Sequence, residues 1–167
     1  MDVDEEYSAY VAARWPVLVR SAVLLGCSVH EAEDLVQSTL VKCYVSWDKV
    51  AKASNQDGYV FRIMLNTHRS NHRRWWREQP YGRLPDGAPR DTGEVPGVAD
   101  TVREALSGLS VDGRAVVVLR FFADFTDQQT ADVLGIPLGT VKSRLSRALA
   151  RLGQDPSLAD IIGRSQP

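Results

Sequence analysis

Near the carboxyl end of the chain, several small polar and basic side chains have types and spacing suited to DNA. In the segment 139–152, Val141, Leu145 and Ala148 recur at helical spacing, which predicts one apolar face. The polar members of the same segment are Thr140, Lys142, Ser143, Arg144, Ser146, Arg147 and Arg151, with no acidic residue among them. Cations and hydroxyls are the groups that meet phosphates and base edges. This pattern favours a recognition helix; the alternative is a solvated basic helix in an all-α domain.

The residues before this helix have the pattern of a helix-turn-helix. Thr126 and Gln129 have capping-box spacing, which predicts the start of a short helix. Gly135 suits a left-handed helix end, and Ile136-Pro137 favours an extended corner before the second helix opens at Gly139-Thr140. A short helix, a tight turn and a longer helix make this motif.

A second basic cluster lies in the middle of the chain. Its members are Arg69, Arg73, Arg74, Trp75, Trp76 and Arg77. Arginines interleaved with aromatic rings suit a groove that tracks single-stranded nucleic acid and stacks its bases. The alternative, equally weighted on the residues alone, is that a tryptophan belongs to the core and the arginines solvate a helix end.

Neither a metal site nor a catalytic site is expected. His68 and His72 stand four residues apart, which is a metal-ligand spacing, but no third ligand is evident nearby. The sequence offers no nucleophile–base set, phosphate-cradling glycine loop or paired carboxylates, so we expect no enzyme activity and no cofactor. Cys27 and Cys43 lie in apolar helical contexts and are expected to be buried, reduced thiols.

The composition is that of a soluble protein whose charges are unevenly distributed. Of 167 residues, 44% are hydrophobic and 25% charged, and the formal net charge is only -1. The first segments are acidic, whereas the middle and the last helix are basic, and local patches rather than the total determine phosphate contact. No apolar run approaches the roughly 20 residues of a membrane span. The acidic start is unlike a signal peptide, so we expect a cytoplasmic protein without membrane contact.

Three helices are expected in the first domain, residues 1–77. The first runs to about Leu25, with Pro16 interrupting it and Gly26 ending it. Ser28 and Glu31 form another capping-box pattern, and the second helix continues to Trp47.

The polar segment Asp48 to Asp57 lacks periodicity and is predicted to be a loop. A third helix follows, with Tyr59, Val60, Ile63, Met64, Thr67 and Asn71 on its buried side. Three helices with complementary apolar faces make one compact domain.

The rest of the chain is predicted to form a linker, a second helical domain and a tail. Residues 78–97 hold four prolines and almost no large apolar residue, which is typical of a flexible linker. Helical patterns resume over 98–152, with one helix starting at Ser110, and residues 153–167 form a tail. The predicted fold class is therefore all-α, with two small helical domains joined by a linker.

Together these segments resemble a bacterial RNA polymerase sigma factor of the extracytoplasmic-function group. Residues 31–37 resemble the polymerase-binding helix, 59–76 the promoter-melting helix, and 109–152 the helix-turn-helix domain of the group. The Ala13-Arg14-Trp15-Pro16 segment and the Trp75-Trp76-Arg77 ending resemble an actinobacterial subgroup, the sigma-E family. Gly113 departs from the group's pattern and should weaken its helix by up to about 1 kcal/mol relative to alanine.

The resemblance implies roles for individual residues. Asp34 and Gln37 would bind core RNA polymerase. Lys52 and Asn55 would capture a flipped base of the minus-ten element, at a cost of a few kcal/mol for its extrusion. The separated strand would be held by the basic third helix, through Arg62, Arg69, Arg73, Arg74, Trp75 and Trp76. Lys142, Ser143, Ser146 and Arg147 would face the minus-thirty-five major groove, with Thr140 and Arg144 nearer phosphate.

The leading hypothesis is thus a sigma factor that acts with core RNA polymerase on promoter DNA and helps to open it, with an anti-sigma factor as a further partner suggested by the group. The second hypothesis is an autonomous helix-turn-helix regulator, which would bind promoters tightly without polymerase. A third is a protein-interaction module whose basic face meets an acidic partner.

Overall fold

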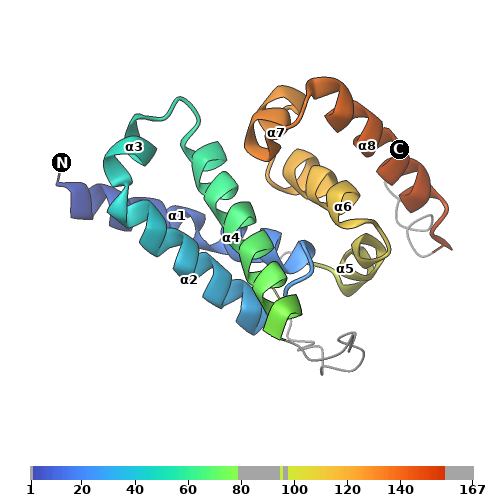
Figure 1. The fold of residues 1–167 in the computed structure, drawn as a ribbon, viewed down its shortest axis with the longest axis horizontal. Coiled ribbons are helices and arrows are strands. Elements are labelled where there is room, and N and C mark those ends of the chain that lie inside the picture. Colours follow the sequence, from blue (N-terminus) through green and yellow to red (C-terminus); the bar gives the residue numbers. More distant parts are fainter. Residues whose placement is uncertain (1, 79–94, 96–97, 157–167) are drawn as a thin grey trace. The chain divides into compact units, whose positions relative to one another are not determined.

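The computed structural model describes residues 2–78, 95 and 98–156, except for the side chains of residues 75–78. The described residues are all-helical and contain no strand, which confirms the predicted class (Figure 1). In chain order the elements are α1 Val3–Leu24, α2 Val29–Val45, α3 Trp47–Lys52, α4 Gln56–Glu78, α5 Asp100–Ser107, α6 Val111–Val117, the π-helical segment η1 Val118–Phe122, α7 Asp127–Leu134 and α8 Leu138–Gly153.

Two compact units share these elements. The first comprises residues 1–19 and 28–93, and the second comprises residues 20–27 and 94–167. The end of α1 and the turn after it, residues 20–27, therefore belong to the second unit. The predicted linker at 78–97 and most of the predicted tail lie outside the described residues.

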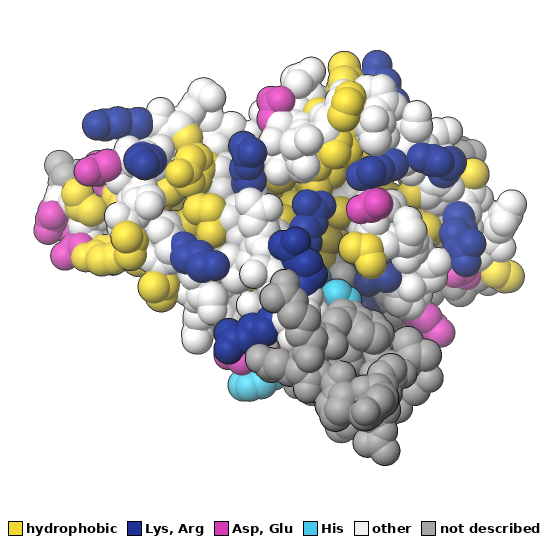
Figure 2. Space-filling model, viewed as in Figure 1, with side chains coloured by type: hydrophobic (Ala, Val, Ile, Leu, Met, Phe, Trp, Pro, Cys, Tyr) yellow, Lys and Arg dark blue, Asp and Glu magenta, His cyan; other side chains and the backbone are white. Residues whose placement is uncertain are grey.

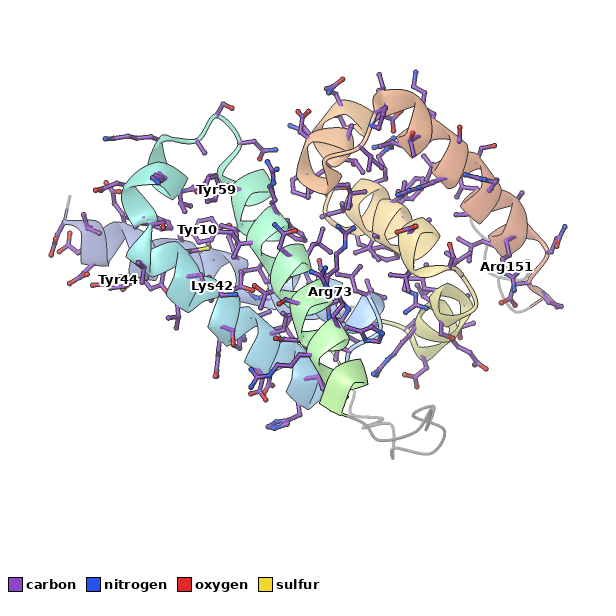
Figure 3. All side chains as sticks on the ribbon, viewed as in Figure 1. Tyr10, Lys42, Tyr44, Tyr59, Arg73 and Arg151 are labelled. Carbon is purple, nitrogen blue, oxygen red and sulfur yellow. The ribbon has the colours of Figure 1, made fainter. Side chains whose placement is uncertain are left out.

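Contacts of α2 and α3 with α4 form the core of the first unit. Its fully buried side chains include Val36, Val50, Phe61 and Met64. Two polar contacts fix α4 against neighbouring helices. The Tyr10 hydroxyl donates to Asp57 Oδ1 at 2.9 Å, and Lys42 Nζ donates to Thr67 Oγ1 at 2.9 Å. Figure 3 labels Tyr10 and Lys42 among the side chains of this unit.

In the second unit, α6 and α7 pack against α8. Val116, Val118, Leu119 and Val141 are completely buried there. Gly113 is buried as well, and a Cβ built on it would lie 3.6 Å from the Cβ of Ala148 and 3.1 Å from Ser110 Oγ. An added Cβ would thus make ordinary van der Waals contact with Ala148 of α8 and a tighter contact with Ser110, the N-cap of α6.

The prediction of a loop over Asp48 to Asp57 was wrong. Residues Trp47–Lys52 form α3, and only residues 53–55 separate it from α4. Trp47 and Val50 are 3% and 0% exposed, so this helix of six residues is stabilised by burial of these two side chains. The second helix accordingly ends at Val45 rather than at Trp47.

The prediction that Pro16 interrupts the first helix was also wrong, because α1 is continuous through it. A proline removes one hydrogen bond from a helix interior. Leu18, Val19, Ala22 and Val23 are buried after it, and their packing outweighs that loss.

On the predicted face of α4, Val60, Met64 and Thr67 are buried, whereas Asn71 is exposed. Phe61 and Leu65 are additional core residues of this helix.

Candidate nucleic-acid interface

Local hydrogen bonds fix the helix-turn-helix in the way the sequence predicts. The Thr126 hydroxyl accepts from Gln129 N at 3.1 Å, and Gln129 Oε1 accepts from Thr126 N at 2.9 Å, which completes the capping box of α7. Gly135 ends α7 in the left-handed region, with φ of 65°. Pro137 is extended and precedes the first residue of α8.

One face of α8 packs on the rest of the second unit, and the opposite face is polar and exposed to solvent. Val141 and Ala148 are 0% and 4% exposed and anchor the helix. Lys142, Ser143 and Ser146 are exposed, and Thr140 is half-buried. The Ser143 hydroxyl donates to Gly139 O at 2.9 Å and remains accessible as an acceptor. The structure thus brings the predicted base-facing residues together on the solvent side of one helix.

A second basic surface lies beside the first, where α8 meets the start of α6. A pocket of about 470 Å³ is lined by Leu109, Ser110, Asp112, Gly113, Arg144, Arg147, Ala148 and Arg151. Arg144 Nη2 is 3.8 Å from Asp112 Oδ2, and Arg147 Nε donates to Ser143 O at 3.4 Å. The structure therefore places Arg147 at the border between the groove-facing surface and this pocket. Figure 2 shows Lys and Arg side chains along the course of α8.

The turn between η1 and α7 is braced by one arginine. Arg120 Nε is 2.6 Å from Asp127 Oδ1, and its Nη1 donates to Phe125 O at 2.6 Å. Asp124, in the same turn, has a φ of 58°. These contacts tie Arg120 of η1 to the turn before α7 and to the first residue of that helix.

Three of the arginines predicted on the third helix share one face of α4. Arg62, Arg69 and Arg73 follow one another at intervals of seven and four residues, which is the spacing of a single helical stripe. All three are exposed, as is Arg74, which lies off the stripe. Trp75 and Trp76 continue the helix, but their side chains lie outside the described residues.

The two residues nominated for base capture lie at either end of the short 53–55 connection. Lys52 is the exposed last residue of α3. Asn55 is half-buried, and its Oδ1 accepts from Gly58 N at 3.0 Å, so this side chain caps α4.

Comparison with known proteins agrees with this geometry. Residues 99–152 match the family described as Sigma-70, region 4. The chain is 37% identical over 165 residues to the RNA polymerase sigma-E factor of Streptomyces avermitilis, covering 96% of this chain and 90% of the relative. It is 34% identical over 165 residues to the sigma-E factor of Streptomyces coelicolor, covering 96% and 91%. The chain belongs to the extracytoplasmic-function RNA polymerase sigma factors.

A solved relative supports the same assignment at the level of the fold. The sigma factor RpoE of Bartonella quintana, in complex with the anti-sigma factor NepR, superposes with a TM-score of 0.74 at 30% identity, covering 90% of this chain and 96% of that one. This sigma factor is accordingly a non-catalytic specificity subunit that directs core RNA polymerase to promoter DNA. The comparisons support this function and not that of an autonomous regulator.

The sigma factor also carries an exposed surface on α2 that sequence reasoning identified only in part. Asp34 and Gln37 are exposed, and His30 Nε2 lies 3.5 Å from Asp34 Oδ2. One and two turns further along lie Val41 and Val45, with exposures of 63% and 81%. Both valines fall outside the apolar stripe of the helix. Their position in the sequence could therefore have indicated that they are exposed apolar residues.

The described residues of the sigma factor contain no group of three or more His, Cys, Asp or Glu side chains placed to hold a metal ion. His68 and His72 have ring centroids 6.4 Å apart. Cys27 and Cys43 are buried, as predicted. Among the described helices, none combines the length and apolarity needed to cross a membrane.

Proposed function

We propose that the second unit of this sigma factor reads the minus-thirty-five element through α8. The observation that carries this proposal is the division of α8 into a buried face, at Val141 and Ala148, and an exposed face with Lys142, Ser143 and Ser146. A helix so anchored can lie in the major groove with the exposed face toward base edges. Thr140, at the start of the helix, is placed to meet phosphate.

The first unit binds core polymerase and opens the minus-ten element. The polymerase-binding surface consists of Asp34, Gln37, Val41 and Val45 on α2, a mixed polar and apolar stripe. The separated strand follows Arg62, Arg69 and Arg73 along α4, with Arg74, Trp75 and Trp76 at its end and with Lys52 and Asn55 beside the flipped base. In this proposal, residues 78–97 tether the predicted domain 1–77 to the predicted domain 98–152, although residues 20–27 belong to the second unit. About 20 residues span up to some 66 Å when extended.

An inhibitory partner belongs to the same proposal. The Bartonella relative was solved in complex with an anti-sigma factor. We infer that this sigma factor is likewise held by an anti-sigma factor in the cytoplasm until it is released to polymerase. Affinity purification from the native host should recover polymerase subunits and this inhibitor.

Run-off transcription with purified core polymerase tests the central function. The sigma factor should produce transcripts from a subset of genomic fragments, and the Lys142→Ala/Ser146→Ala variant should lose selectivity among minus-thirty-five sequences. Absence of any transcript that depends on the sigma factor would contradict the proposal, as would unchanged selectivity in the variant.

A further inference from the structure

Asp57, in the first turn of α4, is bound through both carboxylate oxygens by two residues of α1. The Tyr10 hydroxyl donates to Asp57 Oδ1 at 2.9 Å, and Arg14 Nη2 lies 2.8 Å from Asp57 Oδ2. Tyr10 and Arg14 stand four residues apart, so their side chains project from the same face of α1. Hydrogen bonds to an ionised carboxylate are short and directional, and two of them fix its orientation. The start of α4 is thereby held against α1.

The cap of α4 is supplied by a different residue from the one that binds α1. An acidic residue in the first turn of a helix commonly stabilises the free backbone donors of that helix. Here Asn55 Oδ1 accepts from Gly58 N, and Asn55 O accepts from Tyr59 N, each at 3.0 Å. A Cβ built on Gly58 would lie 2.6 Å from Asn55 Nδ2, so a glycine at this position makes room for the cap. Asn55 therefore caps α4, and Asp57 ties the same helical turn to α1.

The 53–55 connection is so short that its position depends on the start of α4. At its other end, Ala53 N donates to Val50 O at 3.2 Å, and the Val50 side chain is completely buried. Ser54, between the two anchored ends, is exposed. Each residue spans at most about 3.6 Å, so three residues leave little slack between fixed ends. A shift of the first turn of α4 would therefore move this connection.

We propose that Asp57, held by Tyr10 and Arg14, is a positioning residue for base capture in the minus-ten element. Asp57 does not touch the base; it fixes the first turn of α4 and, through Asn55, the connection beside which the flipped base is bound. Extruding a base costs free energy, and a preorganised connection avoids the further cost of ordering the site during capture. This inference rests on the proposed function of the first unit and deepens it.

Tyr10→Phe tests this contact and has a matched control on the same helix. The change removes the hydroxyl that donates to Asp57, while the ring keeps its contact with Trp47, whose ring centroid lies 5.6 Å away. Tyr7→Phe removes an equivalent hydroxyl, which donates to Leu40 O at 3.0 Å. The Tyr7 ring also contacts Trp47, with 5.4 Å between centroids. A general loss of packing should affect both variants, whereas base capture should depend on the Tyr10 hydroxyl.

The probe is a single-stranded oligonucleotide with the non-template minus-ten sequence of a promoter found by run-off transcription. An abasic site introduced at each position in turn should weaken binding of the wild-type holoenzyme most at the captured base. Tyr10→Phe and Asp57→Ala holoenzymes should bind the intact oligonucleotide several-fold more weakly than wild type, but the oligonucleotide abasic at that position equally well. Tyr10→Phe should add nothing to Asp57→Ala, and Tyr7→Phe should keep wild-type affinity for both oligonucleotides.

The possible failures of this experiment separate the inference from the proposed function. Equal losses in Tyr10→Phe and Tyr7→Phe would overturn the inference, as would a Tyr10→Phe holoenzyme that discriminates intact from abasic DNA as wild type does. A loss in Asp57→Ala with Tyr10→Phe unaffected would also overturn it, because Asp57 would then act on the DNA directly. If no abasic position weakened wild-type binding more than the others, base capture by the first unit would itself be contradicted.

Discussion

At the scale of single residues, Arg114 shows how a half-buried cation can bind the carbonyls at a helix end. Its Nε donates to Leu106 O at 3.0 Å, and its Nη2 donates to Ser107 O at 3.3 Å and to Leu109 O at 3.2 Å. These carbonyls lie at the end of α5 and just beyond it, and Leu106 O also accepts from Leu109 N at 3.1 Å. Burial lowers the pKa of Arg114 from its ordinary value.

Replacing Arg114 by methionine should therefore destabilise the protein while keeping much of the apolar stem. A carbonyl that loses its donor costs about 1–3 kcal/mol where it is shielded from water. The Ser107 carbonyl is exposed and Leu106 O keeps the donor Leu109 N, so we expect the free energy of unfolding to fall by about 2 kcal/mol in urea denaturation. Arg144→Met, which removes only the long ion pair with Asp112, should cost less than about 1 kcal/mol. Equal losses in the two variants would show that the carbonyl contacts of Arg114 contribute little.

Cys43 gives a pH-dependent prediction with a defined sign. Burial raises the pKa of its thiol from 9.0 to about 11. The folded protein disfavours the thiolate more than the unfolded chain does. The buried, neutral thiol of Cys43 therefore makes its full contribution to the free energy of unfolding below pH 9, and this contribution should be lost as the pH rises from 9 toward 11.

Thiol titration measures this protection directly. At pH 9, Cys43 should react with a disulfide reagent far more slowly in native protein than in urea, since the thiolate is the reactive form. In a Cys27→Ser background, which isolates the Cys43 signal, fast reaction of native protein at this pH would contradict the prediction.

At the scale of elements, the turn of the helix-turn-helix depends on one left-handed residue. Gly135 has a φ of 65° and open space around its Cα, so an added Cβ meets a backbone penalty but no clash. Gly135→Ala should cost about 1–2 kcal/mol, and Gly135→Asn less, because asparagine tolerates this conformation.

Gly139 provides the matched control within the same motif. It lies in the first turn of α8, has no positive φ and has nothing within 4 Å of a Cβ position. Gly139→Ala should therefore be neutral or stabilising, by up to about 1 kcal/mol. Thermal unfolding of the three variants tests this order, and destabilisation at both glycines alike would refute the assignment of the cost to φ.

Elements whose signals are local could be predicted from the sequence, and those that depend on tertiary packing could not. The capping boxes at Ser28 and Thr126 and the left-handed glycine at 135 each combine a few neighbouring residues, and all are present as predicted. By contrast, α3 has only Trp47 and Val50 to bury, which is too short a run to show a period. The change from α6 to the π-helical η1 could not be predicted either, because the apolar run across these residues is compatible with both an α-helix and a π-helix.

The candidate site likewise has features that the sequence could predict and features that depend on tertiary packing. The sequence indicated which α8 residues are polar, but the pocket beside α6 brings Arg144, Arg147 and Arg151 together with Asp112, residues 32 to 39 positions away in the sequence. No periodicity within α8 could reveal that neighbour. On α2, the exposed Val41 and Val45 could have been found as apolar residues outside the buried stripe.

At the scale of the whole molecule, strand opening should be separable from initial binding. Trp75→Ala with Trp76→Ala removes two potential stacking surfaces at the end of α4, each stacked base contributing about 1–3 kcal/mol. The double variant should form the closed complex normally and open the minus-ten region poorly. Permanganate reactivity of unpaired thymines measures opening, and unchanged footprints would refute a melting role for the pair.

Under the proposed function, polymerase binding uses α2 in the first unit and minus-thirty-five reading uses α8 in the second, so the two properties should fail independently. Val41→Asp with Val45→Asp places charges on two highly exposed positions of α2, so the helix should fold normally but lose affinity for core polymerase. Lys142→Ala with Ser146→Ala should keep full affinity for core polymerase, yet the holoenzyme should choose promoters poorly. Fluorescence titration with core enzyme and run-off transcription measure the two properties. If the α2 variant bound core polymerase normally, or if the α8 variant lost core binding as well, the two surfaces would not have the separate tasks that their residues indicate.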